Sequence, residues 1–220
     1  MRRSGTLAEQ VHVAPIRGTW PSMTSGSGEA SRAMLRVVSR LRSYGLLRTG
    51  GNVSARLQHD SFLITPTGFS VDRLGSIRQK DLVTVAIGGP QPPLRASSET
   101  PLHTLLYARF DDIRGICHAH PPSVMALGEP SDWPLATAAA IKFMPVHLAS
   151  GAGKDLARSI APLLDAPDNQ LKSAYGVTIV VPGHGIFSAS WSIQRALYLL
   201  MRIDENATVA LLRGSLDDGR

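Results

Sequence analysis

The stretch GICHAHPPS, residues 115–123, places two histidines two positions apart at the end of an apolar run. Successive side chains of a β-strand point to opposite faces, so His118 and His120 present their imidazoles on one face, while Cys117 and Ala119 point to the other. Two neighbouring imidazoles form a bidentate grip for Zn²⁺ or a similar ion. The pattern therefore predicts a strand that ends in half of a metal site. The alternative is two polar residues at a strand end, before a Pro-Pro stop.

Helical and extended patterns alternate on both sides of this strand. Apolar residues from Met34 to Leu41 recur at the spacing of one helix face and predict an amphipathic helix over 30–44. Further helices are expected over 97–110, 154–164 and 190–214, and strands over 61–65, 81–87, 112–120, 143–148, 177–181 and 185–189. The segment TGGNVSARL (49–57) is expected to form a glycine-rich turn. Interleaved strands and helices indicate an α/β layered domain.

A third histidine and a glutamate are candidates to complete the metal site. His184 lies between two glycines directly after an apolar strand, where little crowds its side chain. It suits a third ligand, and the alternative is a turn histidine. Glu99 lies at a loop-to-helix junction, where Ser97 or Ser98 can cap the following helix. A buried glutamate beside a metal serves as a ligand or a general base, whereas an exposed one would only interact with the helix dipole.

Three short stretches have the composition of anion-binding turns: Gly51-Asn52-Val53-Ser54, Thr65-Pro66-Thr67-Gly68 and Ser97-Ser98. Each offers backbone N–H groups and small hydroxyl or amide side chains, and the last opens a helix. Each stretch alone is an ordinary turn, so only the combination of all three supports an anion-binding site.

The order GNVSAR, ITPTG, SSETPLH, HAHPP and GHG resembles the class II aldolase/adducin family, especially its L-fuculose-1-phosphate aldolase branch, over roughly residues 30–212. The resemblance implies a three-layer α/β/α domain with a mostly antiparallel central sheet. It also implies a homotetramer with active sites at subunit interfaces, and a small phosphorylated sugar as substrate.

The resemblance also assigns roles to residues. A divalent metal, most often Zn²⁺ with Mn²⁺, Co²⁺ or Fe²⁺ as alternatives, would be held by His118, His120 and His184. Glu99 would act as the base and ligate the metal when no substrate is bound. The substrate's phosphate would be held by Gly51, Asn52, Thr67, Gly68, Ser97 and Ser98.

The chain departs from this branch at one catalytic position. Fuculose-phosphate aldolases use a tyrosine from a neighbouring subunit as proton donor, expected here near residues 133–144. That stretch contains no tyrosine, and Ala138 takes the place by rough alignment. Either another group donates the proton, with Lys142 and His147 as candidates, or the reaction differs. The sequence thus favours an aldolase that cleaves or forms a ketose 1-phosphate. A decarboxylase or dehydratase on the same scaffold is the alternative, and a non-catalytic adducin-like binding module is the third.

Charge and composition limit the domain organisation, the partners and the cellular location that we expect. Residues 1–48 hold eight arginines and two acidic residues and so carry the whole net charge of +6, while the rest of the chain is neutral. We therefore expect a flexible basic extension over 1–28, a catalytic domain over 29–214 and a short tail over 215–220, with no nucleic-acid partner. No apolar run reaches membrane-spanning length, no signal sequence is evident, and there is one cysteine, all of which favours the cytoplasm.

Overall fold

The computed structural model describes residues 26–48, 50–68, 77–126, 146–148, 152–165, 172–173, 175–181 and 183–217. Its helices are α1 (Ser27–Ser43), α2 (Thr100–Arg109), α3 (Pro122–Ala126), α5 (Gly153–Asp165) and α6 (Ile193–Asp217), with a 3₁₀ turn η1 (Gln79–Asp81). Its strands are β1 (Gly51–Gln58), β2 (Ser61–Ile64), β3 (Val83–Ala86), β4 (Gly115–Ala119), β5 (Val146–Leu148), β6 (Lys172–Ser173), β7 (Gly176–Val181) and β8 (Gly185–Ser190).

The strands form one sheet in the order β3-β2-β1-β4-β8-β7-β5, with β6 also paired to β7. Every described pairing is antiparallel except that of β5 with β7. The predicted histidines lie in β4, directly after it, and directly before β8, and these two strands are neighbours in the middle of the sheet.

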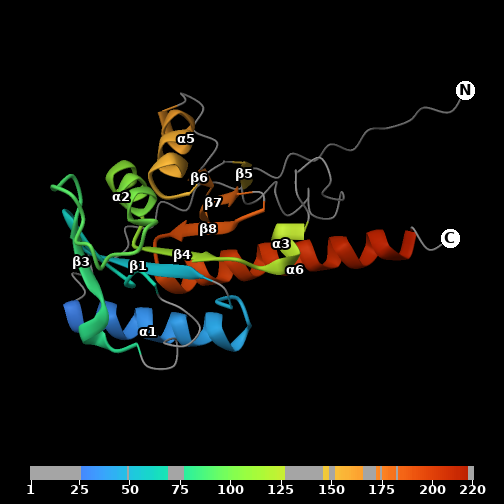
Figure 1. Cartoon of the computed structure of the whole chain (residues 1–220), viewed down its shortest axis with the longest axis horizontal. Coiled ribbons are helices and arrows are strands. Elements are labelled where there is room, and N and C mark those ends of the chain that lie inside the picture. Colours follow the sequence, from blue (N-terminus) through green and yellow to red (C-terminus); the bar gives the residue numbers. More distant parts are fainter. Residues whose placement is uncertain are drawn as a thin grey trace, which may run out of the picture.

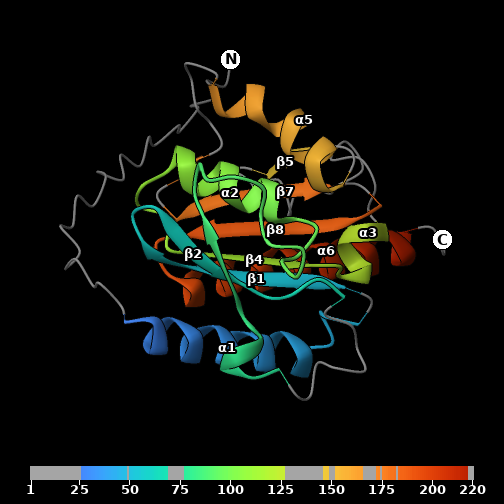
Figure 2. The same cartoon turned by 60° about the vertical axis from the view of Figure 1, so that its left-hand side comes forward.

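Helices cover both faces of the sheet, as Figures 1 and 2 show: α1 and α6 lie on one face, and α2 and α5 on the other. Strands β4, β7 and β8 are buried along their whole length because each face packs against helices. Cys117 and Ala119 join the core under α1 and α6, whereas Ile116 joins the core under α2 and α5. The predicted three-layer α/β/α fold with a mostly antiparallel sheet is confirmed.

The expectation of a turn at residues 49–57 is wrong, because β1 runs through it between β2 and β4. Gly, Asn and Ser favour turns in isolation, but here pairing with distant strands determines the extended conformation. Its register sets Asn52 opposite His118, so this strand brings one of the stretches predicted to bind an anion to the histidines. Helix α3 and the short β6 were not predicted.

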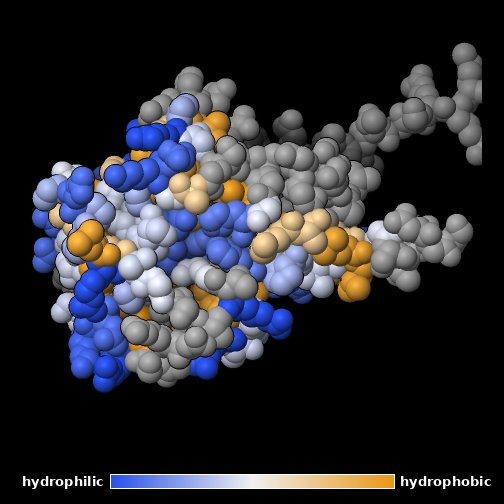
Figure 3. Space-filling view, in the orientation of Figure 1, coloured by the Kyte–Doolittle hydropathy of each residue, from blue (hydrophilic) through white to orange (hydrophobic). Residues whose placement is uncertain are grey.

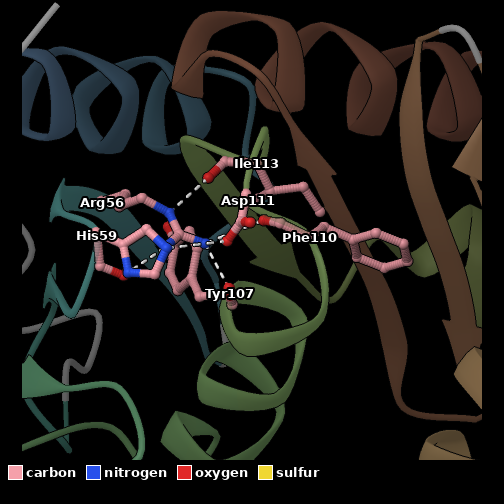
Figure 4. A network of polar contacts seen from close by, with 6 residues as sticks. All are labelled: Arg56, His59, Tyr107, Phe110, Asp111 and Ile113. Carbon is pink, nitrogen blue, oxygen red and sulfur yellow. Dashed lines mark hydrogen bonds and ion pairs between the residues drawn. The ribbon is translucent and has the colours of Figure 1, made fainter. Parts of the chain in front are cut away.

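The side chain of Arg56 on β1 fixes the end of α2 (Figure 4). It is buried, and its guanidinium donates to the carbonyl oxygens of Ile113, His59, Tyr107 and Phe110. Two of these acceptors, Tyr107 and Phe110, belong to the C-terminal end of α2, where carbonyl groups lack helical partners and attract a cation. The bond network ties the helix that begins beside Glu99 to the central sheet.

Helices α1 and α6 extend slightly past the expected domain boundaries, since α1 begins at Ser27 and α6 continues to Asp217. Most of the basic extension, residues 1–25, lies outside the described residues. In Figure 3, hydrophobic residues reach the surface over α3 and the distal part of α6, where Met125, Val209 and Leu212 are exposed. None of the helices within the described part of the chain is long and apolar enough to span a membrane.

Candidate metal centre and anion cradle

Three histidines converge at the end of the central strands. His118 lies in β4 one residue before its end, His120 directly follows that strand, and His184 lies in the turn between β7 and β8. The Nε2 atom of His118 lies 2.9 Å from Nε2 of His120 and 3.2 Å from Nε2 of His184. Within the described residues these three are the group of side chains able to hold a metal, with ligand atoms within 4.8 Å of one another.

The orientation and protonation of His118 suit a metal ligand. Its Nδ1 donates to the carbonyl oxygen of Ile186 at 2.9 Å, which leaves the Nε2 lone pair directed at the other two rings. Burial, followed by the repulsion of His120, holds the pKa of His118 well below 6.5. Burial, followed by His184, lowers the pKa of His120 to about 4. Both imidazoles are neutral at neutral pH, the form that binds metal.

Glycines make room for the ring of His120. A Cβ on Gly50 would lie 2.9 Å from its Cε1, and a Cβ on Gly185 would lie 2.8 Å from its Cδ2 and 2.4 Å from the carbonyl oxygen of Ala119. We expected the glycines flanking His184 to allow a close approach. Gly185 does, whereas a Cβ on Gly183 would meet nothing within 4 Å. Gly50 was not predicted as part of the site, although the sequence Gly-Gly at 50–51 could have indicated it.

Glu99 lies beside the histidine cluster, and its carboxylate is turned to a backbone group. The residue is buried at the start of α2, and its Oε2 accepts a hydrogen bond from the N–H of Gly153 at 2.9 Å. Its carboxylate is not within the group formed by the three histidines. The expected cap from Ser97 or Ser98 is wrong, because Glu99 itself occupies the N-cap position without a side-chain cap bond, and Ser97 Oγ instead accepts from the N–H of Glu99.

Backbone hydrogen bonds join the three stretches that were predicted to bind an anion. Thr65 pairs with Val53 of β1 through its N–H, and its Oγ1 accepts from the N–H of Val53. The N–H of Ser97 donates to the carbonyl of Thr65, and the N–H of Thr67 donates to Arg95. The stretches around residues 52, 67 and 97 are therefore held side by side, although up to 45 residues separate them in the sequence.

All the predicted site residues line one pocket of about 250 Å³. They are Gly51, Asn52, Thr67, Gly68, Ser97, Ser98, Glu99, His118, His120 and His184. The lining also contains Gly50 and Pro66. The structure thus brings together every residue that the sequence had singled out for metal, base and phosphate.

The predicted anion contacts need one correction. The N–H groups of Val53, Thr67 and Ser97 are used within the protein, so they are not free to hold an anion. Ser54 is buried away from the pocket, where its Oγ shares hydrogen bonds with His103 and Tyr107. Anion binding must rest on other groups of the pocket, among them the side-chain amide N–H groups of Asn52, which can donate to an anion.

Other candidate residues fall outside the site. Cys117 points away from the histidines into the core, and burial raises the pKa of its thiol, so it is no nucleophile. His103 is fully buried one helical turn after Glu99, and its Nδ1 bonds Ser54. Lys142 lies outside the described residues, and β5 carries His147 without a described side chain.

Comparison with known proteins identifies the family of this chain. The chain matches the family described as "Class II Aldolase and Adducin N-terminal domain" over residues 32–211. Because that match spans most of the chain, the protein belongs to this family.

Its relatives carry different activities. A 3,4-dihydroxyphthalate decarboxylase of Arthrobacter keyseri is 28% identical over 204 residues, which cover 88% of this chain and 81% of that protein. A methylthioribulose-1-phosphate dehydratase of Acidiphilium cryptum (strain JF-5) is 28% identical over 202 residues, covering 82% and 90%. The structure of L-fuculose-1-phosphate aldolase from Thermus thermophilus superposes with a TM-score of 0.64 and 25% identity, covering 86% and 96%. The family is therefore one of enzymes with several reactions on one scaffold.

Proposed function

We propose that this protein is a divalent-metal-dependent lyase that cleaves or forms a small ketose 1-phosphate, with dihydroxyacetone phosphate and an aldehyde as the other partners of the reaction. The observation that carries the proposal is the single pocket in which three histidines, a buried glutamate and a polar cradle meet. An anionic substrate and a Lewis acid are the two components that such a pocket is suited to combine.

The donor set fits a metal ion. Tetrahedral Zn²⁺ with Zn–N bonds of 2.0–2.1 Å requires nitrogen atoms about 3.3 Å apart, and the measured Nε2 separations from His118 are 2.9 and 3.2 Å. His118, His120 and His184 would hold the ion, with Zn²⁺ as the first choice and Mn²⁺, Co²⁺ or Fe²⁺ as alternatives. When bound, it supplies a Lewis acid that stabilises negative charge developing on the substrate's oxygen atoms.

The chain's own residues supply the remaining functions. Glu99 is the one carboxylate in the described lining of the pocket, so it is the group that takes a proton from the substrate and returns it to the carbon of the dihydroxyacetone phosphate half. Asn52, Thr67 and Ser98 line the same pocket and hold the phosphate, which keeps the reacting atoms aligned with Glu99. Gly51, Gly68 and Ser97 shape this part of the pocket. We also retain the homotetramer as a proposal, in which a neighbouring subunit closes the pocket.

A specific observation favours a second candidate, decarboxylation or dehydration at the same centre. Residues 133–144 lack the tyrosine that aldolases of this branch use as proton donor, and two relatives with matches along most of their length are named as a decarboxylase and a dehydratase. The non-catalytic adducin-like interpretation is the weakest, because such a module has no need of the full set of histidines and Glu99.

A retro-aldol assay tests the proposal. Zinc-loaded protein is incubated with ketose 1-phosphates of the fuculose, rhamnulose, ribulose and 5-deoxyribulose types, and release of dihydroxyacetone phosphate is followed with a coupled reductase. We expect release that disappears in Glu99→Gln, and loss of both zinc and activity in His118→Ala. Zinc binding without release from any substrate would select decarboxylation or dehydration, and full zinc occupancy in His118→Ala would contradict the metal site.

A further inference from the structure

The hydrogen bond between Glu99 and Gly153 joins the pocket to a helix that the family motifs do not include. Gly153 is the first residue of α5, where backbone N–H groups have no helical acceptor. The carboxylate of Glu99 accepts from this N–H at 2.9 Å. The bond satisfies an orphan donor and places a negative group at the positive end of a helix, which stabilises both.

Hydrogen bonds hold the backbone of Glu99 in place, so only its side chain can change its partner. Its N–H donates to Ser97 Oγ, and its carbonyl accepts from Leu102 and His103 in the first turn of α2. Since the backbone is held, the carboxylate can interact with one of two partners: a metal ion at the histidine cluster, which borders the same pocket, or the N–H of Gly153. In this structure it takes the second.

The position of Gly153 depends on its being glycine. Its φ of +54° lies in the left-handed region, and a Cβ there would lie 3.3 Å from the carbonyl oxygen of Ser98. Helix α5 is held against α2 by buried Leu156 and Ile160, and by Arg109, which donates to the carbonyl of Leu164. The donor is therefore presented to Glu99 by two packed helices.

We propose that Gly153 is a positioning residue whose N–H competes with the metal ion for the carboxylate of Glu99. By holding Glu99 outside the coordination sphere, it keeps the carboxylate available to accept a proton. This inference rests on the proposed function, in which the three histidines bind the metal and Glu99 is the base. It predicts that removal of one N–H strengthens metal binding, a result that ordinary structural damage does not produce.

The test replaces the Gly153 amide by an ester, through incorporation of the α-hydroxy acid analogue of glycine, which removes the N–H and adds no side chain. Zinc affinity without substrate is measured by competition with a chromophoric chelator. We expect zinc to bind about tenfold more tightly, because the state that competes with zinc binding loses one charge-assisted hydrogen bond. The same replacement in a Glu99→Gln background should leave zinc affinity unchanged, because a neutral amide does not compete for the ion.

A matched control separates this effect from damage to α5. An ester at Leu156 removes the N–H that donates to Ala152 at 3.4 Å in the same helix, without touching Glu99, and it should not strengthen zinc binding. Unchanged or weaker zinc binding in the Gly153 ester, with His118→Ala still abolishing it, would overturn the role of Gly153 and leave the proposed metal site standing. Zinc binding that is insensitive to His118→Ala would overturn the proposed function itself.

Discussion

The imidazole of His118 lies face to face with the ring of Phe187, with centroids 3.8 Å apart and planes 4° from parallel. The two residues are direct partners in the antiparallel register of β4 and β8. The neighbouring carbonyl, that of Ile186, accepts the hydrogen bond from Nδ1 of the same imidazole. One edge and one face of this ring are thus fixed by two successive residues of β8, which directs Nε2 toward the other histidines.

We therefore expect Phe187→Leu to weaken metal binding. Loss of the stacked ring frees His118 to rotate, and losses of about tenfold in metal affinity are typical when a group that orients a ligand is removed. Zinc affinity is measured by chelator competition. Phe62→Leu is the matched control, since Phe62 is equally buried in the same core and packs against the tilted ring of Tyr107 instead. A similar loss of zinc affinity in both variants would assign the effect to general destabilisation.

Local patterns predicted much of this fold and the side chains of its site. Alternation along β4 placed His118 and His120 on one face, and apolar spacing located the long helices to within a few residues. These features depend on residues close in sequence, whose geometry follows from the strand or helix that carries them. The pocket lining, by contrast, was implied by the resemblance of the ordered short motifs to a known family.

Features that depend on distant partners were not predictable in this way. Residues 49–57 have the composition of a turn and become strand β1 only because β2 and β4 flank them. Phe187 is ordinary in sequence until register sets it opposite His118. The N–H of Gly153 has no sequence signal at all, since its partner Glu99 lies 54 residues earlier.

Arg56→Lys should destabilise the protein strongly. A lysine ammonium cannot reach the four carbonyl groups that the buried guanidinium contacts, so several buried acceptors lose their donor. We expect the free energy of unfolding in urea to fall by about 2–4 kcal/mol. Arg202→Lys, at an exposed ion pair with Glu205, should change it by less than about 0.5 kcal/mol. Equal effects of the two changes would contradict the anchoring role of Arg56.

Gly51→Ala should disrupt the junction between β1 and β4. Gly51 has a φ of +124°, and a Cβ would lie 2.4 Å from Leu47 Cδ2 and 2.6 Å from the carbonyl oxygen of His118. Gly88→Ala is the control, because Gly88 also has a positive φ, +74°, but open space around it. We expect the free energy of unfolding in urea to fall by about 1 kcal/mol for Gly88→Ala, from backbone strain alone. For Gly51→Ala we expect a clearly larger fall.

His103 should make stability depend on pH. Burial lowers its pKa from 6.5 to about 3, so it stays neutral when folded and gains a proton on unfolding below pH 6.5. The contribution of neutral His103 to the free energy of unfolding is complete above pH 6.5 and is lost as the pH falls from there toward 3. Between pH 6 and 5 the loss is about 1 kcal/mol. His103→Gln should reduce the slope of this part of the curve in metal-free protein, where His118 and His120 also contribute because their pKa values are lowered. An unchanged slope would show that His103 does not contribute.

Asn52→Asp should separate anion binding from metal binding, because Asn52 lines the pocket, pairs with His118 across β1 and β4, and offers amide N–H donors that an aspartate lacks. A carboxylate of the same shape repels a phosphate, so we expect at least a tenfold rise in KM for a phosphorylated substrate, or in the inhibition constant of inorganic phosphate. Zinc affinity should not fall, since a negative charge near the cation site favours the ion. Asn52→Ala removes the amide without adding charge, and its smaller rise in KM isolates the hydrogen bond. Equal KM values for wild type and Asn52→Asp would mean that the anionic group binds elsewhere, whereas parallel losses of phosphate and zinc binding would mean that the strand β1 has moved.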